Sequence, residues 1–209
     1  MAAGGGCAAE ADLDHVLATA DAGGDSLFGS IDREKVFAYN EAKAGAAVRA
    51  LKPWARRREA VPFVLSDDDD PELIIHIPFT CNVQLRSIAV VGADGEDGSA
   101  PASVRIFANR EDVDFDLGHD LEPCQEITDL VCSATGDADH ALRPDKFRSC
   151  WAVTLFFTDS RAGGATRISY IGFKGRRISP KRQAVNAIYE LVGAPEASSG
   201  ALEVPKFVS

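Results

Sequence analysis

Residues 72–79 read Glu-Leu-Ile-Ile-His-Ile-Pro-Phe, and this stretch is the strongest indication of the class of fold. After Glu72 the residues are apolar at successive positions, with His76 as the exception, so both faces of an extended chain are apolar here. Such a stretch is typical of a strand that is covered on both sides. We therefore predict a central, buried strand over residues 72–79. His76 is predicted to be a core histidine that is hydrogen-bonded to a neighbour.

The chain immediately after this strand contains a conflict of register. Val83 and Leu85 share one parity, whereas Ile88 and Val90 share the other. Side chains alternate between the two faces of a strand, so one regular strand cannot direct both pairs into one core. A β-bulge near residues 86–87 shifts the register by one residue and resolves the conflict. We therefore predict a bulge there.

Other short apolar runs surround this strand, with turn residues between them. Runs at residues 61–65 and 103–108 are separate strand candidates, and residues 150–158 alternate cleanly. The Gly-Gly turn that follows predicts that residues 166–173 form the hairpin partner of 150–158. Short strands punctuated by turns, with no convincing long helix, predict an all-β, antiparallel β-sandwich.

The N-terminal part of the chain differs from the rest in amino-acid composition. Residues 1–26 are rich in Ala, Gly and Asp, which predicts a flexible tail, and the rest (27–209) is predicted to form one domain that includes a C-terminal tail. Within that domain, residues 42–51 have the composition of a short helix that ends before Pro53. The residues expected to dock the segment before this helix on the core are Ile31, Val36 and Phe37.

Charge and cysteine usage narrow the class of function. The net charge of −10 argues against DNA, RNA and anionic membranes as partners, because phosphate binding needs concentrated Lys and Arg. The first basic residue is Arg33 and no apolar run approaches the roughly 20 residues of a membrane span, so we expect neither a secretory signal nor a membrane anchor. Five cysteines without a Cys-x-x-Cys predict reduced thiols in a cytoplasmic and nuclear protein.

The residues that could support catalysis or bind a metal do not have the spacing of the known motifs. There is no Gly-x-Ser-x-Gly elbow, and the four histidines are isolated. Asp112, Asp114 and Asp116 resemble the start of a calcium loop, but Leu117 stands where that loop needs glycine and Pro123 where it needs glutamate. We interpret this stretch as a strand with one acidic face, and we expect no enzyme activity, no cofactor and no metal site.

A basic cluster lies near the end of the last clear strand. Five cations occupy residues 174–182, with no aromatic residue between them that could stack on a base. We interpret the cluster as a solvated face or as an intramolecular partner of the acidic loops, with a partner-protein patch as the alternative.

Several strings, in their order along the chain, resemble the PITH (proteasome-interacting thioredoxin) domain family. They are residues 31–41, 51–54 (LKPW), 63–67 (FVLSD), 78–83 (PFTCNV), 104–109 (VRIFAN) and 166–175 (TRISYIGFKG). The resemblance implies a galactose-binding-like jelly roll, and it makes residues 184–190 a final strand although their local spacing is helical. In some members the domain follows a thioredoxin domain and docks that protein on the 26S proteasome. This chain lacks the thioredoxin half and resembles the standalone members, so their redox activity is not expected here.

The expected function is therefore binding, by a monomer, to the regulatory particle of the 26S proteasome. An aromatic residue beside a rigid proline can anchor a partner protein, so Lys52, Pro53 and Trp54 are candidate contacts with the partner. The alternative is that Trp54 plugs the open end of the sandwich. The C-terminal Phe207, Val208 and Ser209 could insert into a partner's groove, or could be a frayed terminus. The alternatives are a carbohydrate or small-ligand binding module, a regulatory binder of another protein, and a thiol redox protein.

Overall fold

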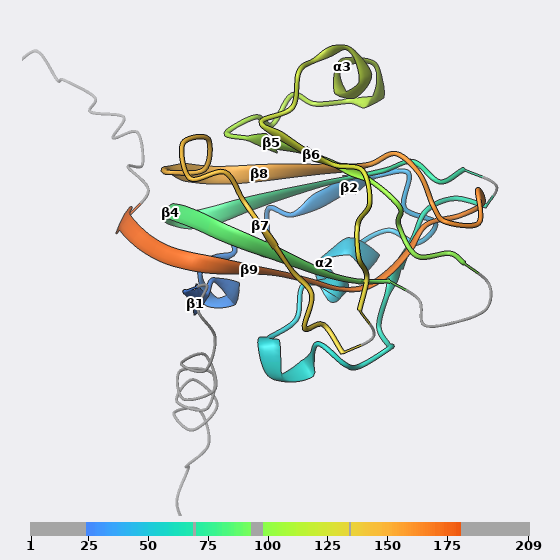
Figure 1. Cartoon of the computed structure of the whole chain (residues 1–209), viewed down its shortest axis with the longest axis horizontal. Coiled ribbons are helices and arrows are strands. Elements are labelled where there is room, and N and C mark those ends of the chain that lie inside the picture. The colour runs from blue at the N-terminus through green and yellow to red at the C-terminus, as the bar shows by residue number, and fades with distance from the viewer. Residues whose placement is uncertain (1–23, 69, 93–97, 134, 181–209) are drawn as a thin grey trace, which may run out of the picture.

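The computed structural model of this chain describes residues 24–68, 70–92, 98–133 and 135–180. In this part of the chain the strands form two antiparallel layers (Figure 1), so the predicted all-β sandwich is confirmed. The three long strands are β4 (Leu73–Gly92), β8 (Cys150–Phe157) and β9 (Arg167–Pro180). The short strands are β1 (Asp25–Ser26), β2 (Phe37–Tyr39), β3 (Val64–Leu65), β5 (Val104–Ala108), β6 (Gln125–Ile127) and β7 (Asp139–Ala141).

Helices in the described residues are short, and α2 (Ala46–Ala50) contributes its buried Ala46, Ala47 and Ala50 to the main core between the layers. The other described α-helix is α3 (Phe115–Asp120), and the 3-10 helices are η2 (Phe28–Ser30) and η3 (Trp54–Arg56). α2 lies inside the predicted helical segment, at residues 42–51. Figure 1 places α3 beyond one layer and η3 beyond the other.

β4 belongs to both layers. Its residues 73–78 pair with β8, and its residues 81–92 pair with β9. The first layer runs β2–β4–β8–β5–β6. In the second layer β7 pairs with β4, whereas β1 and β3 pair with the opposite edge of β9. One strand therefore connects the two sheets through its own backbone.

The predicted bulge is present in β4. Leu85 pairs with Gly175 and Ser87 pairs with Lys174, so Arg86 is the additional residue. The shift directs Val83 and Leu85 on one side of the bulge, and Ile88 and Val90 on the other, into the same core, where all four are fully buried. The central, covered strand predicted at residues 72–79 is likewise confirmed, because residues 73–79 are all buried.

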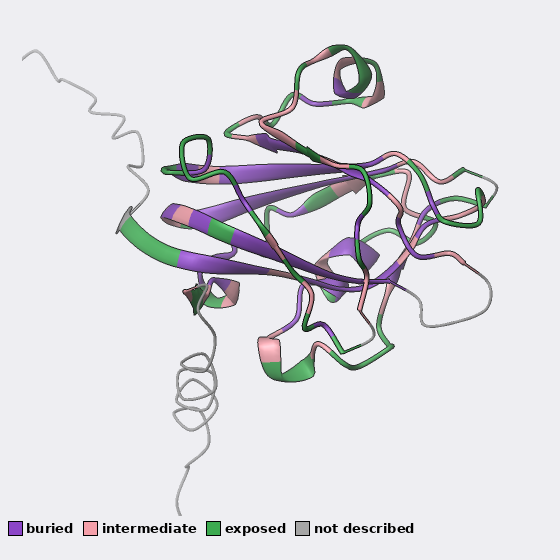
Figure 2. Cartoon of the chain, in the orientation of Figure 1, coloured by how far each residue is buried: buried purple, intermediate pink, exposed green. Residues whose placement is uncertain are grey.

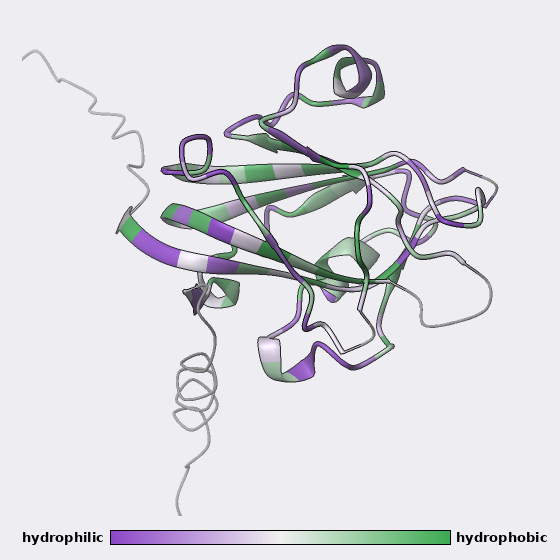
Figure 3. Cartoon of the chain, in the orientation of Figure 1, coloured by the Kyte–Doolittle hydropathy of each residue, from purple (hydrophilic) through white to green (hydrophobic). Residues whose placement is uncertain are grey.

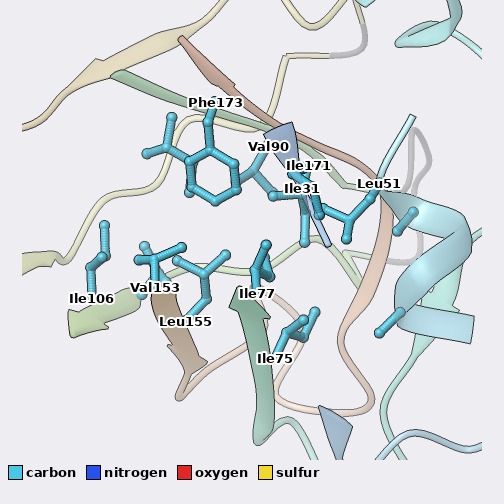
Figure 4. Packing of buried hydrophobic residues seen from close by; sticks show 14 of the residues in the cluster. Ile31, Leu51, Ile75, Ile77, Val90, Ile106, Val153, Leu155, Ile171 and Phe173 are labelled. Atoms are coloured by element: carbon cyan, nitrogen blue, oxygen red, sulfur yellow. The ribbon is translucent and has the colours of Figure 1, made fainter. Parts of the chain in front are cut away.

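The main core fills the space between the layers. In Figure 4, Ile75, Ile77 and Leu155 of the first layer face Ile171 and Phe173 of the second. Figure 2 shows long buried stretches along β4, β8 and β9, and Figure 3 shows the apolar residues on the same strands. Two smaller clusters cover the outer faces, so these strands are buried on both sides.

One pairing prediction is wrong. The segments 150–158 and 166–173 are not hairpin partners, because β8 and β9 each pair with β4 and lie in different layers. The connection crosses between the sheets, and the Thr166 N–H donates to Ser66 Oγ at 2.8 Å while the Thr166 hydroxyl donates to the Pro71 carbonyl at 2.6 Å. These bonds hold the chain beside β3 and away from β8.

The acidic repeat at residues 112–116 is not a strand. Asp114 is the N-cap of α3, and its Oδ1 accepts the Leu117 N–H at 2.8 Å. An aspartate that bonds the backbone three residues later favours a helix start over extended chain. Arg105 secures the other end of α3, where its guanidinium donates to the carbonyls of Gly118, His119 and Leu121.

Two N-terminal expectations also need correction. Ile31 and Val36 are buried as predicted, but Phe37 is 39% exposed because Ala38 takes the inward position in β2. Asp25 and Ser26, which were predicted to belong to the flexible tail, form β1 on the edge of β9. Residues 1–23 and the final strand predicted at 184–190 lie outside the described residues.

The close packing of Gly175 against β4 beside the bulge predicts that a change to alanine destabilises the protein. A Cβ at this position would run into the Gln84 carbonyl oxygen, which belongs to the backbone and cannot turn away. We expect Gly175→Ala to lower the free energy of unfolding by about 1–3 kcal/mol, as overpacking does. Gly164→Ala is the matched control, because a Cβ there has nothing within 4 Å. Urea unfolding of both variants measures the effect, and equal stability would contradict the close packing at the bulge.

Candidate interaction surfaces

The predicted contact residues 52–54 lie on a loop that is fixed to the outer face of the second layer. Leu51 forms a parallel bridge with Ile171 of β9, which sets the loop against that sheet. Pro53 is the N-cap of η3, with a φ of −57° that suits a turn start. Trp54 packs on the outward-facing cluster of Ala89, Val91 and Tyr170 and partly covers it.

The Trp54 ring is held by three side chains. Tyr170 meets it edge-on with ring centroids 6.3 Å apart. Two cations lie over the ring, with Arg57 Cζ at 4.2 Å and Lys174 Nζ at 4.1 Å from its centroid. Each cation is also paired, since Arg57 bonds Asp137 at 3.1 Å and Lys174 bonds Asp139 at 2.5 Å. We call Trp54, Arg57 and Lys174 with these two aspartates the Trp54 site.

The three predicted residues have different environments. Lys52 is 3% exposed, its Nζ donates to the Glu59 carbonyl at 2.8 Å, and burial lowers the pKa of its ammonium. Pro53 and Trp54 remain partly exposed. Lys52 therefore holds the loop together, and the contact with a partner stays a prediction for Pro53 and Trp54. Phe207, Val208 and Ser209 lie outside the described residues.

The basic cluster predicted at residues 174–182 is partly used inside the molecule. Lys174 pairs with Asp139, and Arg177 Nε donates to Ser30 Oγ at 2.6 Å. Arg176 Nε donates to Gln84 Oε1 at 2.7 Å. Lys181 and Arg182 are not among the described residues. The described part of the cluster therefore joins β9 to its neighbours.

A second surface lies on the outer face of the first layer. Phe37 and Tyr39 on β2 are 39% and 42% exposed, and Phe115 of α3 lies beside them. We call Phe37, Tyr39 and Phe115 the β2 aromatic surface. Sequence reasoning missed it because Phe37 was assigned to the core. The alternation of Phe37, Ala38 and Tyr39 was the available signal, since an inward Ala38 places both aromatic rings outside.

His76 lies directly beneath this surface and is the predicted core histidine. It is 2% exposed, and its Nδ1 is 2.9 Å from Thr154 Oγ1. The Thr154 hydroxyl donates its only proton to the Arg110 carbonyl at 2.7 Å, so His76 Nδ1 must be the donor to Thr154. This hydrogen-bonded arrangement fixes the ring and accounts for a polar residue in a covered strand.

Two of the four thiols in the described residues are poorly placed for chemistry. Burial raises the pKa of Cys132 to about 11 and that of Cys150 to about 12. Because the thiolate is the reactive form, these two cysteines are protonated and weakly nucleophilic at neutral pH. Over the described ranges, no group of three or more His, Cys, Asp or Glu side chains is arranged to hold a metal ion. Nor does any helix there have the length and apolar character needed to cross a membrane.

Comparison with known proteins adds a family match. The PITH domain family model matches residues 18–193. PITH domain-containing protein 1 of Dictyostelium discoideum is 33% identical over 165 residues, covering 79% of this chain and 80% of that protein. PITH domain-containing protein 1 of Homo sapiens is 31% identical over 159 residues, covering 76% of this chain and 73% of that protein.

Among solved structures, CBM32-3 from a family 31 glycoside hydrolase of Clostridium perfringens has a similar fold. The TM-score is 0.50 at 12% identity, with 70% of this chain and 95% of that structure covered. At this identity the likeness concerns the fold alone. The predicted galactose-binding-like jelly roll is therefore confirmed as an architecture, and the likeness says nothing about a ligand.

The raised pKa values predict slow alkylation of two cysteines. At pH 8 about one Cys132 in a thousand is ionised, and fewer at Cys150, whose side chain is also buried. We expect iodoacetamide to label both at least about 100-fold more slowly in the folded protein than in urea, because unfolding restores an ordinary thiol pKa. Mass spectrometry of tryptic peptides measures each rate. Equal rates in the two states would contradict the assigned environments.

Proposed function

This chain belongs to the PITH domain family, and from that membership we propose that it is a non-catalytic protein-interaction domain that binds the regulatory particle of the 26S proteasome. The proposal takes up the partner that the family resemblance implies. It needs a rigid surface with an anchoring side chain, because a few central residues carry most of the energy of a protein interface. It also assigns the chain, as a monomer, to the cytoplasm and nucleus.

The observation that carries the proposal is the environment of Trp54. The ring is partly exposed, yet Tyr170, Arg57 and Lys174 hold it in one position. An aromatic side chain that is fixed before binding loses little conformational entropy when a partner covers it. Tryptophan and arginine are also the residue types that most often act as interface anchors. The Trp54 site therefore has the composition and rigidity of an anchor.

Polar groups surround this anchor. Arg56 pairs with Glu59 at 2.8 Å, and Arg58 lies 3.8 Å from Asp137. Both arginine side chains are more than half exposed, so a partner could exchange these weak surface pairs for its own. An aromatic centre with an exposed polar rim is the usual anatomy of a protein interface.

The non-catalytic part of the proposal is supported by how the described histidines and thiols are used. His76 is bonded to Thr154, His119 Nε2 lies 2.7 Å from Glu72 Oε1, and His140 Nε2 lies 3.0 Å from the Val131 carbonyl. Only the first of these contacts involves a possible nucleophile, and the Thr154 hydroxyl is buried and donates its proton to the Arg110 carbonyl rather than to the histidine. The raised pKa values of Cys132 and Cys150 likewise argue against thiol catalysis at these two residues.

Affinity capture tests the proposal. Immobilised full-length chain is incubated with purified 26S proteasome at micromolar concentration, and retained regulatory particle is quantified by immunoblot. We expect retention by the wild type and a loss of about tenfold or more with Trp54→Ala, as for a central anchor. A deletion of residues 200–209 measures the contribution of the C-terminal segment separately.

Phe63→Ala is the matched control. Phe63 is also a partly exposed ring with a cation over it, since Arg167 Cζ lies 4.0 Å from its centroid, but it is outside the Trp54 site. We expect this variant to retain the proteasome within about twofold of wild type, because it lies outside the anchor. Circular dichroism melts of both variants check folding. No retention of the wild type would overturn the function, and retention by a folded Trp54→Ala variant would overturn the assigned anchor.

A further inference from the structure

We propose that the β2 aromatic surface binds an arginine- or lysine-rich segment of a partner protein. This surface lies on the outer face of the first layer, whereas the Trp54 site lies on the outer face of the second. The inference therefore goes beyond the proposed function and does not depend on it.

The exposed rings belong to an ordered strand. β2 pairs with β4 alone among the described strands, with Phe37 opposite His76 and Tyr39 opposite Ile74. Ala38 packs on the main core, so the backbone of β2 is held while the two aromatic side chains face outward. Large apolar side chains that are both exposed and adjacent commonly mark a binding surface.

The rings also order one another. Phe37 stacks on His76 with centroids 4.8 Å apart and an interplanar angle of 28°. Tyr39 meets Phe37 edge-on at 5.4 Å and lies 6.5 Å from Phe115. Because His76 is itself fixed by Thr154, the surface is rigid from its base upward. A partner would find the rings already in place.

The segments around these rings are strongly acidic. Residues 67–72 contain five acidic residues and no basic one, and residues 110–122 contain six acidic residues and one arginine. The first segment is tied to β2, because Asn40 Nδ2 donates to Asp70 Oδ2 at 2.9 Å and to the Glu72 carbonyl at 2.6 Å. The second carries Phe115 of the surface itself. Negative charge therefore borders the rings on two sides.

Some of these carboxylates already have a role. Asp112 pairs with Arg110 at 2.5 Å, and Asp114 caps α3. Asp116 and Asp120 are in α3 beside Phe115, and neither makes an ion pair within the part of the chain that the structure describes. Their charge is therefore available to a cationic partner.

The cations that lie over aromatic rings in the described residues belong to other sites. Arginine or lysine side chains lie over the rings of Phe28, Trp54 and Phe63. Over the described residues, no cation is placed over Phe37 or Tyr39. A guanidinium can rest on an aromatic face and bond a neighbouring carboxylate at the same time. A basic segment matches both features, whereas a second copy of this chain, with a net charge of −10, does not match the acidic border.

Fluorescence anisotropy with defined peptides tests the inference on the full chain. The probe is a fluorescein-labelled Arg–Gly octapeptide, and a Gln–Gly octapeptide is the neutral comparison. We expect saturable binding of the Arg–Gly peptide that weakens as salt increases, because exposed charge pairs are screened. We expect Tyr39→Ala and Asp116→Lys each to weaken this binding by about fivefold or more, since one removes a ring face and the other reverses a bordering charge.

Two matched variants separate local recognition from general attraction. Asp145→Lys makes the same charge change on an exposed residue of the loop before β8, and Ile178→Ala removes an exposed apolar side chain from β9. Both should bind the Arg–Gly peptide within about twofold of wild type. Thermal melts confirm that all variants are folded.

The possible results decide the question without reference to the proteasome. No binding of the Arg–Gly peptide, or equal binding of the Gln–Gly peptide, would overturn the inference. It would also fail if Asp145→Lys weakened binding as much as Asp116→Lys, because the attraction would then reflect net charge alone. Unchanged affinity in a folded Tyr39→Ala variant would remove the aromatic component and with it the assigned surface.

Discussion

β4 pairs with β8 through its first residues and with β9 through its later residues, so one continuous backbone holds the two layers together. This arrangement works only because of the extra residue at Arg86. Without that shift of register, Ile88 and Val90 would face away from the core that Val83 and Leu85 enter. Burial of apolar surface between the layers, the main stabilising contribution in a domain of this size, depends on that bulge.

A strand buried on both faces creates a second requirement, which is that its outer side must also be covered. Ile74 and Phe156 on the outside of the first layer pack against the segment that carries α3. Ala89 and Val91 on the outside of the second layer are covered by the loop that carries Trp54. The Trp54 site is the partly exposed part of the second cover, and Phe115 brings the first cover beside Phe37 and Tyr39 of β2 to complete the β2 aromatic surface. Their positions thus follow from the fact that the central strands are apolar on both sides.

Patterns within one segment were predictable, and relations between segments were not. The parity change between Leu85 and Ile88 located the bulge, and the apolar setting of His76 indicated its burial. The alternation of residues along a strand shows which side chains share a face, but it does not show which strand lies alongside. It therefore could not assign β8 and β9 to different layers. Trp54 stood out in the sequence, but Arg57, Asp139 and Lys174 come from three separated segments, and only the fold brings them to one ring. Asp114 was misassigned because alternation and helix capping can share the same residues.

The charges on the two outer faces are arranged differently, and this difference bears on how the domain can bind. At the Trp54 site the ring already has two cations over it, and both are paired with aspartates, so the local charge is largely compensated. At the β2 aromatic surface the rings have no cation over them among the described residues, and the bordering segments carry uncompensated negative charge. The main core separates the two faces. The two proposed partners would therefore not compete for the same face of the sandwich.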